Sequence, residues 1–313
     1  VGGRALDSMT TGTGNTAVGY DAGGAFTGGG GVFMGYEAGL SLTSGDTALI
    51  GYQAGKRMVG TGNVGLGYGV LYGASSTAAN NTGTYNTAMG VQALRWVSKT
   101  VGSTGIGAEA GYYITGSYNT FVGYKSGYGS ITSAPYSSGG NNTAVGYATL
   151  HNTTSGNDNV AIGYRAGIAT TSASGSVMIG SGAGDATTTG NGHVAIGYGA
   201  LGSGNATADG AVAIGYMAGN TFTNAGNEGS VYIGYKAGQG IVNSTVVMIG
   251  YKAGSSYSGT GKGEGVTLIG HRAGLNSNDD AINNTAVGYA SLYANTAGER
   301  NTVMGRNAGF EIT

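Results

Sequence analysis

Apolar residues recur along the chain in short blocks, and each block ends in a glycine. The residue just before this glycine is always Val, Ile, Leu or Met, and the residue three before it is Val or Thr in every complete copy except at Ala48. Two before the glycine, where strict alternation would place a polar residue, the chain has apolar residues such as Phe33, Leu49 and Met178. Blocks of this length, separated by Gly, Asn, Ser and Thr, predict short β-strands joined by turns.

The glycine that closes each block, here called the anchor glycine, occurs in 18 copies along the whole chain. The anchor glycines are Gly2, Gly19, Gly35, Gly51, Gly67, Gly90, Gly107, Gly123, Gly146, Gly163, Gly180, Gly197, Gly215, Gly234, Gly250, Gly270, Gly288 and Gly305. Most intervals are 16–18 residues and the two longest are 23. Self-similarity at a nearly fixed period is typical of solenoids. We therefore predict an all-β fold: one domain over residues 1–313, built as a parallel β-solenoid of about 18 coils of 16–18 residues.

The same pattern predicts that both faces of each strand are apolar. Side chains alternate along a strand, so the positions three and one before the anchor glycine share one face. We expect this pair to face the interior of the coil and the apolar residue between them to face outward. A continuous outward stripe would expose more apolar surface than a soluble monomer normally shows. We therefore predict that identical copies cover it, in a homotrimer or another parallel homo-oligomer.

Composition removes several classes of protein. Glycine accounts for 68 of 313 residues, with one Pro and no Cys, which disfavours a helical enzyme, collagen and a disulfide framework. With 40% hydrophobic residues and 22 Tyr, the chain has too much apolar surface for a disordered linker. The formal charge of −1 predicts no nucleic-acid partner, and the lack of an 18-residue apolar run predicts no direct membrane insertion.

Residues suited to catalysis are scarce. His151, His193 and His271 have no second ligand at metal-binding spacing, so we interpret them as structural or surface residues. Asp21 and Glu37 lie on adjacent coils, but a glycosidase pair needs a cleft that raises the pKa of the acid, and a convex coil offers none. We expect no enzymatic activity, no cofactor and no metal site.

Charged residues collect at the position two after the anchor glycine, here called the charged column. Three of its cations, Lys236, Lys252 and Arg272, fall on consecutive coils and should repel one another modestly. A bound anion, such as a phosphate of a surface glycan, would relieve this repulsion, whereas a solvated face requires no ligand. The column comprises Asp21, Glu37, Glu109, Lys125, Arg165, Lys236, Lys252 and Arg272.

Two long intervals place extra loops at residues 74–85 and 129–141, and loops on a rigid scaffold often carry recognition. Tyr85 and Tyr136 lie in these loops, and the only Trp, Trp96, follows Arg95. Aromatic rings suit stacking on sugars, so these four residues are candidate glycan contacts, although Trp96 would equally well cover a coil edge. Tyr follows the anchor glycine in 12 of the 18 copies, which predicts either an aromatic ladder or a seam between subunits.

The repeats resemble those of two families. Val194-Ala195-Ile196-Gly197 and Val212-Ala213-Ile214-Gly215 resemble the head repeats of trimeric autotransporter adhesins, and Asn142-Thr143-Ala144-Val145-Gly146-Tyr147 is similar to phage tail-fibre repeats. The adhesin resemblance implies a left-handed parallel β-roll assembled as a trimer. The adhesin repeat is shorter, near 14 residues, so the turns here should be longer. The resemblance also implies an extracellular protein that is a segment of a longer fibre.

Three functions follow as expectations. The first is a structural segment of an extracellular fibre, on a virion tail or a bacterial cell surface, that attaches to a host polysaccharide or protein receptor. An adhesin head or surface filament is the alternative within that class. An ice-binding solenoid is the third, but ice binding needs outward Thr ladders, and we expect the Thr residues three before the anchor glycine to face inward.

Overall fold

The fold is described by a computed structural model of the chain. It describes residues 2–43, 45–74, 81–129, 137–203, 207–221, 228–240, 245–256, 265–277, 282–296 and 298–312. Over these residues the chain is all-β, without helices, and forms a parallel β-solenoid, so the sequence-based fold class is confirmed at this level. By contacts the chain separates into two compact units, Val1–Asp158 and Asn159–Thr313.

Each main strand ends just before an anchor glycine, as the sequence predicted. The first unit contains β1 (Thr16–Val18), β2 (Gly31–Met34), β3 (Thr47–Ile50), β4 (Val64–Leu66), β5 (Thr87–Met89), β6 (Thr104–Ile106), β7 (Thr120–Val122) and β8 (Thr143–Val145). The second contains β9 (Val160–Ile162), β10 (Val177–Ile179), β11 (Val194–Ile196), β12 (Val212–Ile214), β13 (Val231–Ile233), β14 (Val246–Ile249), β15 (Val266–Ile269), β16 (Thr285–Val287), β17 (Ala294–Asn295), β18 (Thr302–Met304) and β19 (Glu311–Ile312).

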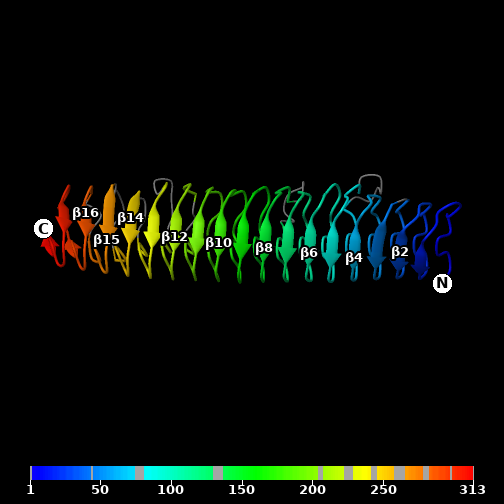
Figure 1. Ribbon diagram of the computed structural model, residues 1–313, viewed down its shortest axis with the longest axis horizontal. Helices are drawn as coiled ribbons and strands as arrows, with labels where there is room; N and C mark the ends of the chain where they lie inside the picture. The colour runs from blue at the N-terminus through cyan, green and yellow to red at the C-terminus, as the bar shows by residue number, and fades with distance from the viewer. Residues whose placement is uncertain are drawn as a thin grey trace. The chain divides into compact units, whose positions relative to one another are not determined.

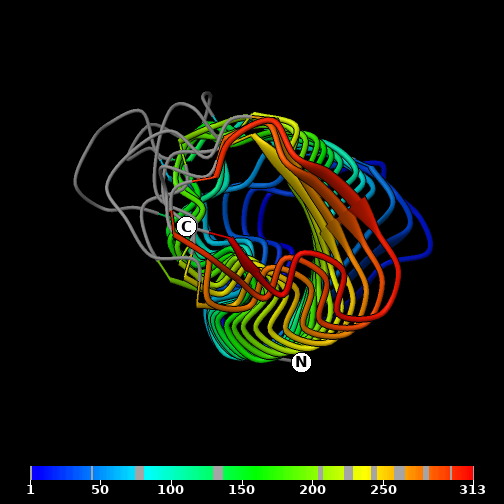
Figure 2. The ribbon, with the colours of Figure 1, turned by 90° about the vertical axis from the view of Figure 1, so that its left-hand side faces the viewer.

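Within each unit, the strands that end before the anchor glycines pair in parallel and in register from coil to coil (Figure 1), and β17 pairs with β19 in a separate two-stranded sheet. Thr87 of β5 aligns with Thr104 of β6, and Val177 of β10 aligns with Val194 of β11. The turns also bond from coil to coil, since the Gly39 N–H donates to the Ala54 carbonyl at 2.8 Å. Figure 2 shows the strands of the second unit stacked along one wall of its coils. Equivalent residues of consecutive coils therefore form continuous columns.

The predicted assignment of the two strand faces is wrong. Side chains two before the anchor glycine, such as Phe33, Met178 and Tyr232, are fully buried inside the coil. Side chains one before it, such as Ile50 and Ile179, face outward and are more than a third exposed. The period of two defines which residues share a face but not which face is inside. The interior takes the residues two before the anchor glycine because buried Ala and Leu side chains of the turns leave it little room, and Ala fills that position in many coils.

An Asn four before the anchor glycine also explains which strand face points inward, because it lies on the same face as the residue two before the glycine. Asn63, Asn86, Asn119 and Asn142 are buried, and each bonds to backbone in a neighbouring coil. Asn63 Oδ1 accepts the Asn86 N–H at 2.9 Å, and Asn119 Oδ1 accepts the Asn142 N–H at the same distance. This series, here called the Asn column, ties the start of each of these strands to the turn that leads into the strand of the next coil, and it was not recognised in the sequence.

The anchor glycine is required by geometry. Gly107 has φ of +127°, outside the region that L side chains adopt. A Cβ atom there would lie 2.7 Å from the carbonyl carbon and oxygen of Gly123 in the next coil. The strand therefore ends where two backbones approach too closely for any side chain.

Candidate functional site

The outward residues three and one before the anchor glycine form one surface in each unit, here called the strand face. The residue one before the glycine is apolar in every coil, whereas the residue three before it is Thr or Val except at Ala48. Ten of the residues directly before the glycine are between 36% and 48% exposed. These ten are Val18, Met34, Ile50, Leu66, Met89, Ile106, Val145, Ile162, Ile179 and Ile214. The predicted outward stripe, made of the residues two before the anchor glycine, is therefore wrong, and the outward surface carries the residues on either side of that position instead.

The Tyr after the anchor glycine stacks from coil to coil and forms a ladder at the end of the strand face. In the first unit Tyr36 and Tyr52 have ring centroids 5.2 Å apart. In the second unit Tyr198, Tyr216 and Tyr235 follow one another at 5.3 and 5.1 Å. The rings remain 39–57% exposed, so this Tyr ladder combines stacking within the chain with an open outer surface. His271 occupies one step of it, 4.9 Å from Tyr251.

Acidic members of the charged column are paired with cations of adjacent coils. Lys56 Nζ lies 2.6 Å from Glu37 Oε2, and Gln53 donates to the same oxygen at 2.7 Å. Burial opposes ionisation of Glu37, but these partners outweigh it and hold the pKa of Glu37 below its ordinary value. Asp21 lies 3.1 Å from Arg4 Nε. Asp21 and Glu37 thus belong to separate ion pairs.

The structure places Lys236, Lys252 and Arg272 on consecutive coils, as predicted. The Lys252 N–H donates to the Tyr235 carbonyl and the Arg272 N–H to the Tyr251 carbonyl, both at 2.8 Å. The two Lys ammonium groups each lie 5.6 Å from the centroid of the preceding ladder ring. Cation–π contact therefore engages these charges within the chain. Whether an anion also binds there stays a prediction.

Arg95 and Trp96 belong to one aromatic and cationic cluster in the first unit. The Arg95 guanidinium lies 4.6 Å from the Tyr72 ring centroid and 5.6 Å from that of Trp96. Trp96 is half-buried and stacks on Tyr113 at 6.3 Å. This geometry agrees with the interpretation that Trp96 covers a coil edge. Tyr72 and Tyr113 were not predicted as members of this cluster because they lie outside the Tyr ladder.

Tyr85 is not part of this cluster. It is 69% exposed and has φ of +58°, at a turn where its ring lies over Gly62. Tyr136 lies outside the described residues, as do most of loop 129–141 and residues 75–80 of loop 74–85. The structure thus brings Arg95 and Trp96 into contact and places Tyr85 on the turn before β5, and glycan binding by these residues stays a prediction.

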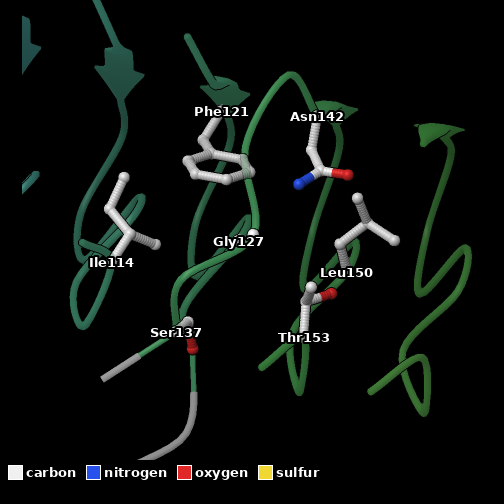
Figure 3. Close-up of a pocket in the computed structure, with 8 residues that line it drawn as sticks. Ile114, Phe121, Gly127, Ser137, Asn142, Leu150 and Thr153 are labelled. Atoms are coloured by element: carbon white, nitrogen blue, oxygen red, sulfur yellow. The ribbon is translucent and has the colours of Figure 1, made fainter. Parts of the chain in front are cut away.

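The interior of the coils is too full to hold a ligand where the structure shows a cavity in the first unit. This cavity measures about 10 Å³, room for at most one water molecule. Figure 3 shows Ile114, Phe121 and Leu150 around it, with Asn142 on the far side from Ile114. This cavity therefore offers no room for a ligand larger than water.

His193 replaces Asn in the Asn column of the second unit. It is fully buried, and its Nδ1 accepts the Ala211 N–H at 3.2 Å. Nδ1 thus stands in for the Asn Oδ1, which requires a neutral ring with its proton on Nε2. Burial lowers the pKa of His193, and the charge of Asp209 opposes this shift. The interpretation of His193 as a structural residue is consistent with these contacts.

Substituting His193 by Asn is expected to flatten the acid side of the stability profile. The folded chain binds a proton at His193 less readily than the unfolded chain, so wild-type stability should fall as the pH drops below about 6.5. His193→Asn keeps the acceptor but cannot be protonated. Urea unfolding between pH 8 and 5 measures the effect. His151→Asn, on a turn, should retain the wild-type loss, and an equal acid loss in both variants would contradict the assignment.

No family model matches the chain, and neither the curated proteins nor the solved structures compared with it include a match. Over the described residues, no group of three or more His, Cys, Asp or Glu side chains is placed to hold a metal ion. The part of the chain that the structure covers also has no helix that is long and apolar enough to cross a membrane. The likeness to tail-fibre and adhesin repeats thus rests on the sequence motifs alone.

Proposed function

We propose that this protein is a structural segment of an extracellular fibre, in which parallel copies bury their strand faces against one another and the remaining surface attaches to a host glycan or receptor. A homotrimer is the assembly we propose, as in the families that the repeats resemble. The observation that carries the proposal is the strand face, which continues in register across β1–β8 and again across β9–β16.

Burial of the strand face gives a physical reason for assembly. Each half-exposed Ile, Val or Met of this surface gains stability when it leaves water, at about 25 cal/mol per Å² of apolar area. The gain repeats with every coil, because the same residue types face outward each time. Flat β-branched rows also pack well against a second copy, and a rotational axis brings the same rows of each copy together.

We expect the purified chain to sediment as a defined oligomer, three times 30.6 kDa for the proposed trimer. Replacing Ile162, Ile179 and Ile214 by Glu should shift it to the monomer, because assembly would bury three unpaired charges. Ser172→Glu adds an exposed charge outside the strand face and serves as the control. Analytical ultracentrifugation reads the result. A monomeric wild-type chain, or equal dissociation by the Ser172 variant, would refute the proposal.

An ice-binding solenoid remains the second candidate. The argument against it was that the Thr residues three before the anchor glycine face inward, and the structure places them outward. Thr87, Thr104, Thr120 and Thr143 are three before the anchor glycine and lie side by side on the outward strand face. Aliphatic residues occupy the neighbouring column, and Val replaces Thr in β9–β13, so the surface is less regular than a Thr-only array. Thermal hysteresis of the purified chain in freezing buffer would support this candidate over the fibre.

A further inference from the structure

The Tyr ladder of the second unit is interrupted at Ser181. This residue follows the anchor glycine between the coils that carry Tyr164 and Tyr198. Those two rings are 54% and 57% exposed, whereas the other ten Tyr of the ladder are between 39% and 48% exposed. The missing ring therefore uncovers the faces of the two rings beside it.

Two glycines deepen the gap into a hollow. Gly182 and Gly199 stand in the charged column, where Arg165 and Lys236 carry long side chains. A Cβ atom on Gly182 would meet nothing within 4 Å. At Gly69, the corresponding glycine of the first unit, Arg95 fills the space instead. The result is an open hollow of about 310 Å³, within the size range of small-ligand sites.

The width of the gap favours a puckered ring over a flat one. Two coil spacings set the Tyr164 and Tyr198 rings about 10 Å apart. A flat aromatic ring in van der Waals contact with both rings needs only about 7 to 8 Å. A pyranose chair is thicker and presents C–H groups on both faces, which suit the electron-rich faces of two Tyr rings.

Polar groups line the hollow beside the two rings. Arg165 Nη2 lies 3.8 Å from Asp185 Oδ2, too far for a hydrogen bond, so both groups keep capacity to bond a ligand hydroxyl. Ser203 and Asn220 complete this wall, and Asn220 Nδ2 is fixed by donation to the Gly199 carbonyl at 2.9 Å. One cation and one carboxylate leave the hollow without net charge, which favours a neutral ligand over an anion.

The hollow does not use the strand face. Its lining consists of residues on turns after the anchor glycines, and none belongs to β9, β10, β11 or β12. Copies that pack through their strand faces would leave these turns in water. A ligand at the hollow is therefore compatible with the proposed assembly.

We propose that the gap between Tyr164 and Tyr198 is a carbohydrate-binding slot that holds one neutral hexopyranose or N-acetylhexosamine ring between the two Tyr faces, with Arg165 and Asp185 bonding its hydroxyls. The slot deepens the attachment role in the proposed function and rests on it. It assigns that role to residues that differ from the glycan contacts expected from the sequence.

The test measures binding of methyl glycosides to the full chain by saturation-transfer NMR and by titration. The glycosides are those of glucose, galactose, mannose, N-acetylglucosamine and N-acetylgalactosamine. At least one glycoside should bind wild type, and Ser181→Tyr, which completes the ladder, should weaken binding at least tenfold. Tyr198→Ala should do the same. Tyr235→Ser is the control. It removes a ladder ring where the charged column carries Lys236 and Lys252 instead of glycines, and it leaves the slot at Ser181 intact, so this variant should bind glycosides as wild type does.

Two results would overturn the slot. One is the absence of binding to any of these glycosides at millimolar concentration. The other is binding that Ser181→Tyr leaves unchanged, as would occur if an aromatic side chain of a second copy occupied the gap. Sedimentation of the same variants separates this failure from failure of the assembly: loss of glycoside binding with the oligomer intact refutes the slot alone. A monomer that still binds glycosides refutes the assembly alone.

Discussion

Replacing Gly107 by Ala is expected to lower the free energy of unfolding by about 4 kcal/mol. Two costs add at this anchor glycine. The new side chain must adopt φ of +127°, and its Cβ must fit 2.7 Å from the Gly123 carbonyl. The coils cannot separate to make room, because the Gly107 N–H bonds to Met89 and the Gly123 N–H to Ile106, both at 2.7 Å. Urea denaturation at fixed protein concentration, followed by circular dichroism, measures the loss.

Gly175→Ala is the matched control. Gly175 has φ of +66° in the left-handed helical region, and a Cβ atom there would meet nothing within 4 Å. Tyr85 and Asn141 hold equivalent turn positions with φ of +58° and +57°, so the fold accepts side chains at this point. The expected loss is about 1 kcal/mol. Equal losses at Gly107 and Gly175 would show that conformational preference alone, without the contact between coils, makes the anchor glycine necessary.

The repeat was sufficient to predict the coils and their strands, because every coil has the same residue types at equivalent positions. A glycine at the strand end, β-branched residues before it and polar turns after it recur often enough to place the strands β1–β16 and β18. The sequence did not determine which face of each strand points into the coil. Alternation places Thr87 and Met89 on one strand face and Asn86 and Ala88 on the other. The hydrogen bonds of Asn86 in the structure show that the second pair faces the interior of the coil.

The surface sites could be predicted only in part. Stacking of Lys236, Lys252 and Arg272 follows from the period, since residues one repeat apart occupy one column. The hollow at Ser181 depends on what is missing: a Ser in the Tyr ladder beside two glycines in the charged column. Each departure is visible in the sequence. Their combination becomes a site only when the coils bring Gly182 and Gly199 next to one another.

Replacing Asn86 by Ala is expected to cost about 3 kcal/mol of the free energy of unfolding, because it leaves the buried Ser103 N–H without its acceptor and removes one of the two bonds to the Thr100 carbonyl. Asn86 Oδ1 accepts the Ser103 N–H at 2.9 Å, and Asn86 Nδ2 donates to the Thr100 carbonyl at 2.7 Å. All three residues are inaccessible to water, so no solvent molecule replaces the lost bonds without reorganisation. Urea denaturation gives the energy, and hydrogen exchange should show faster exchange at the Ser103 amide.

Asn157→Ala tests whether burial, rather than the amide itself, sets this cost. The Asn157 side chain also makes two backbone bonds, accepting from the Gly140 N–H at 2.8 Å and donating to the Ser155 carbonyl at 2.9 Å. Asn157 is exposed, so water can satisfy both groups after the substitution, and the loss should stay below about 1 kcal/mol. A loss at Asn86 as small as that at Asn157 would mean that the Asn column contributes little to holding consecutive coils together.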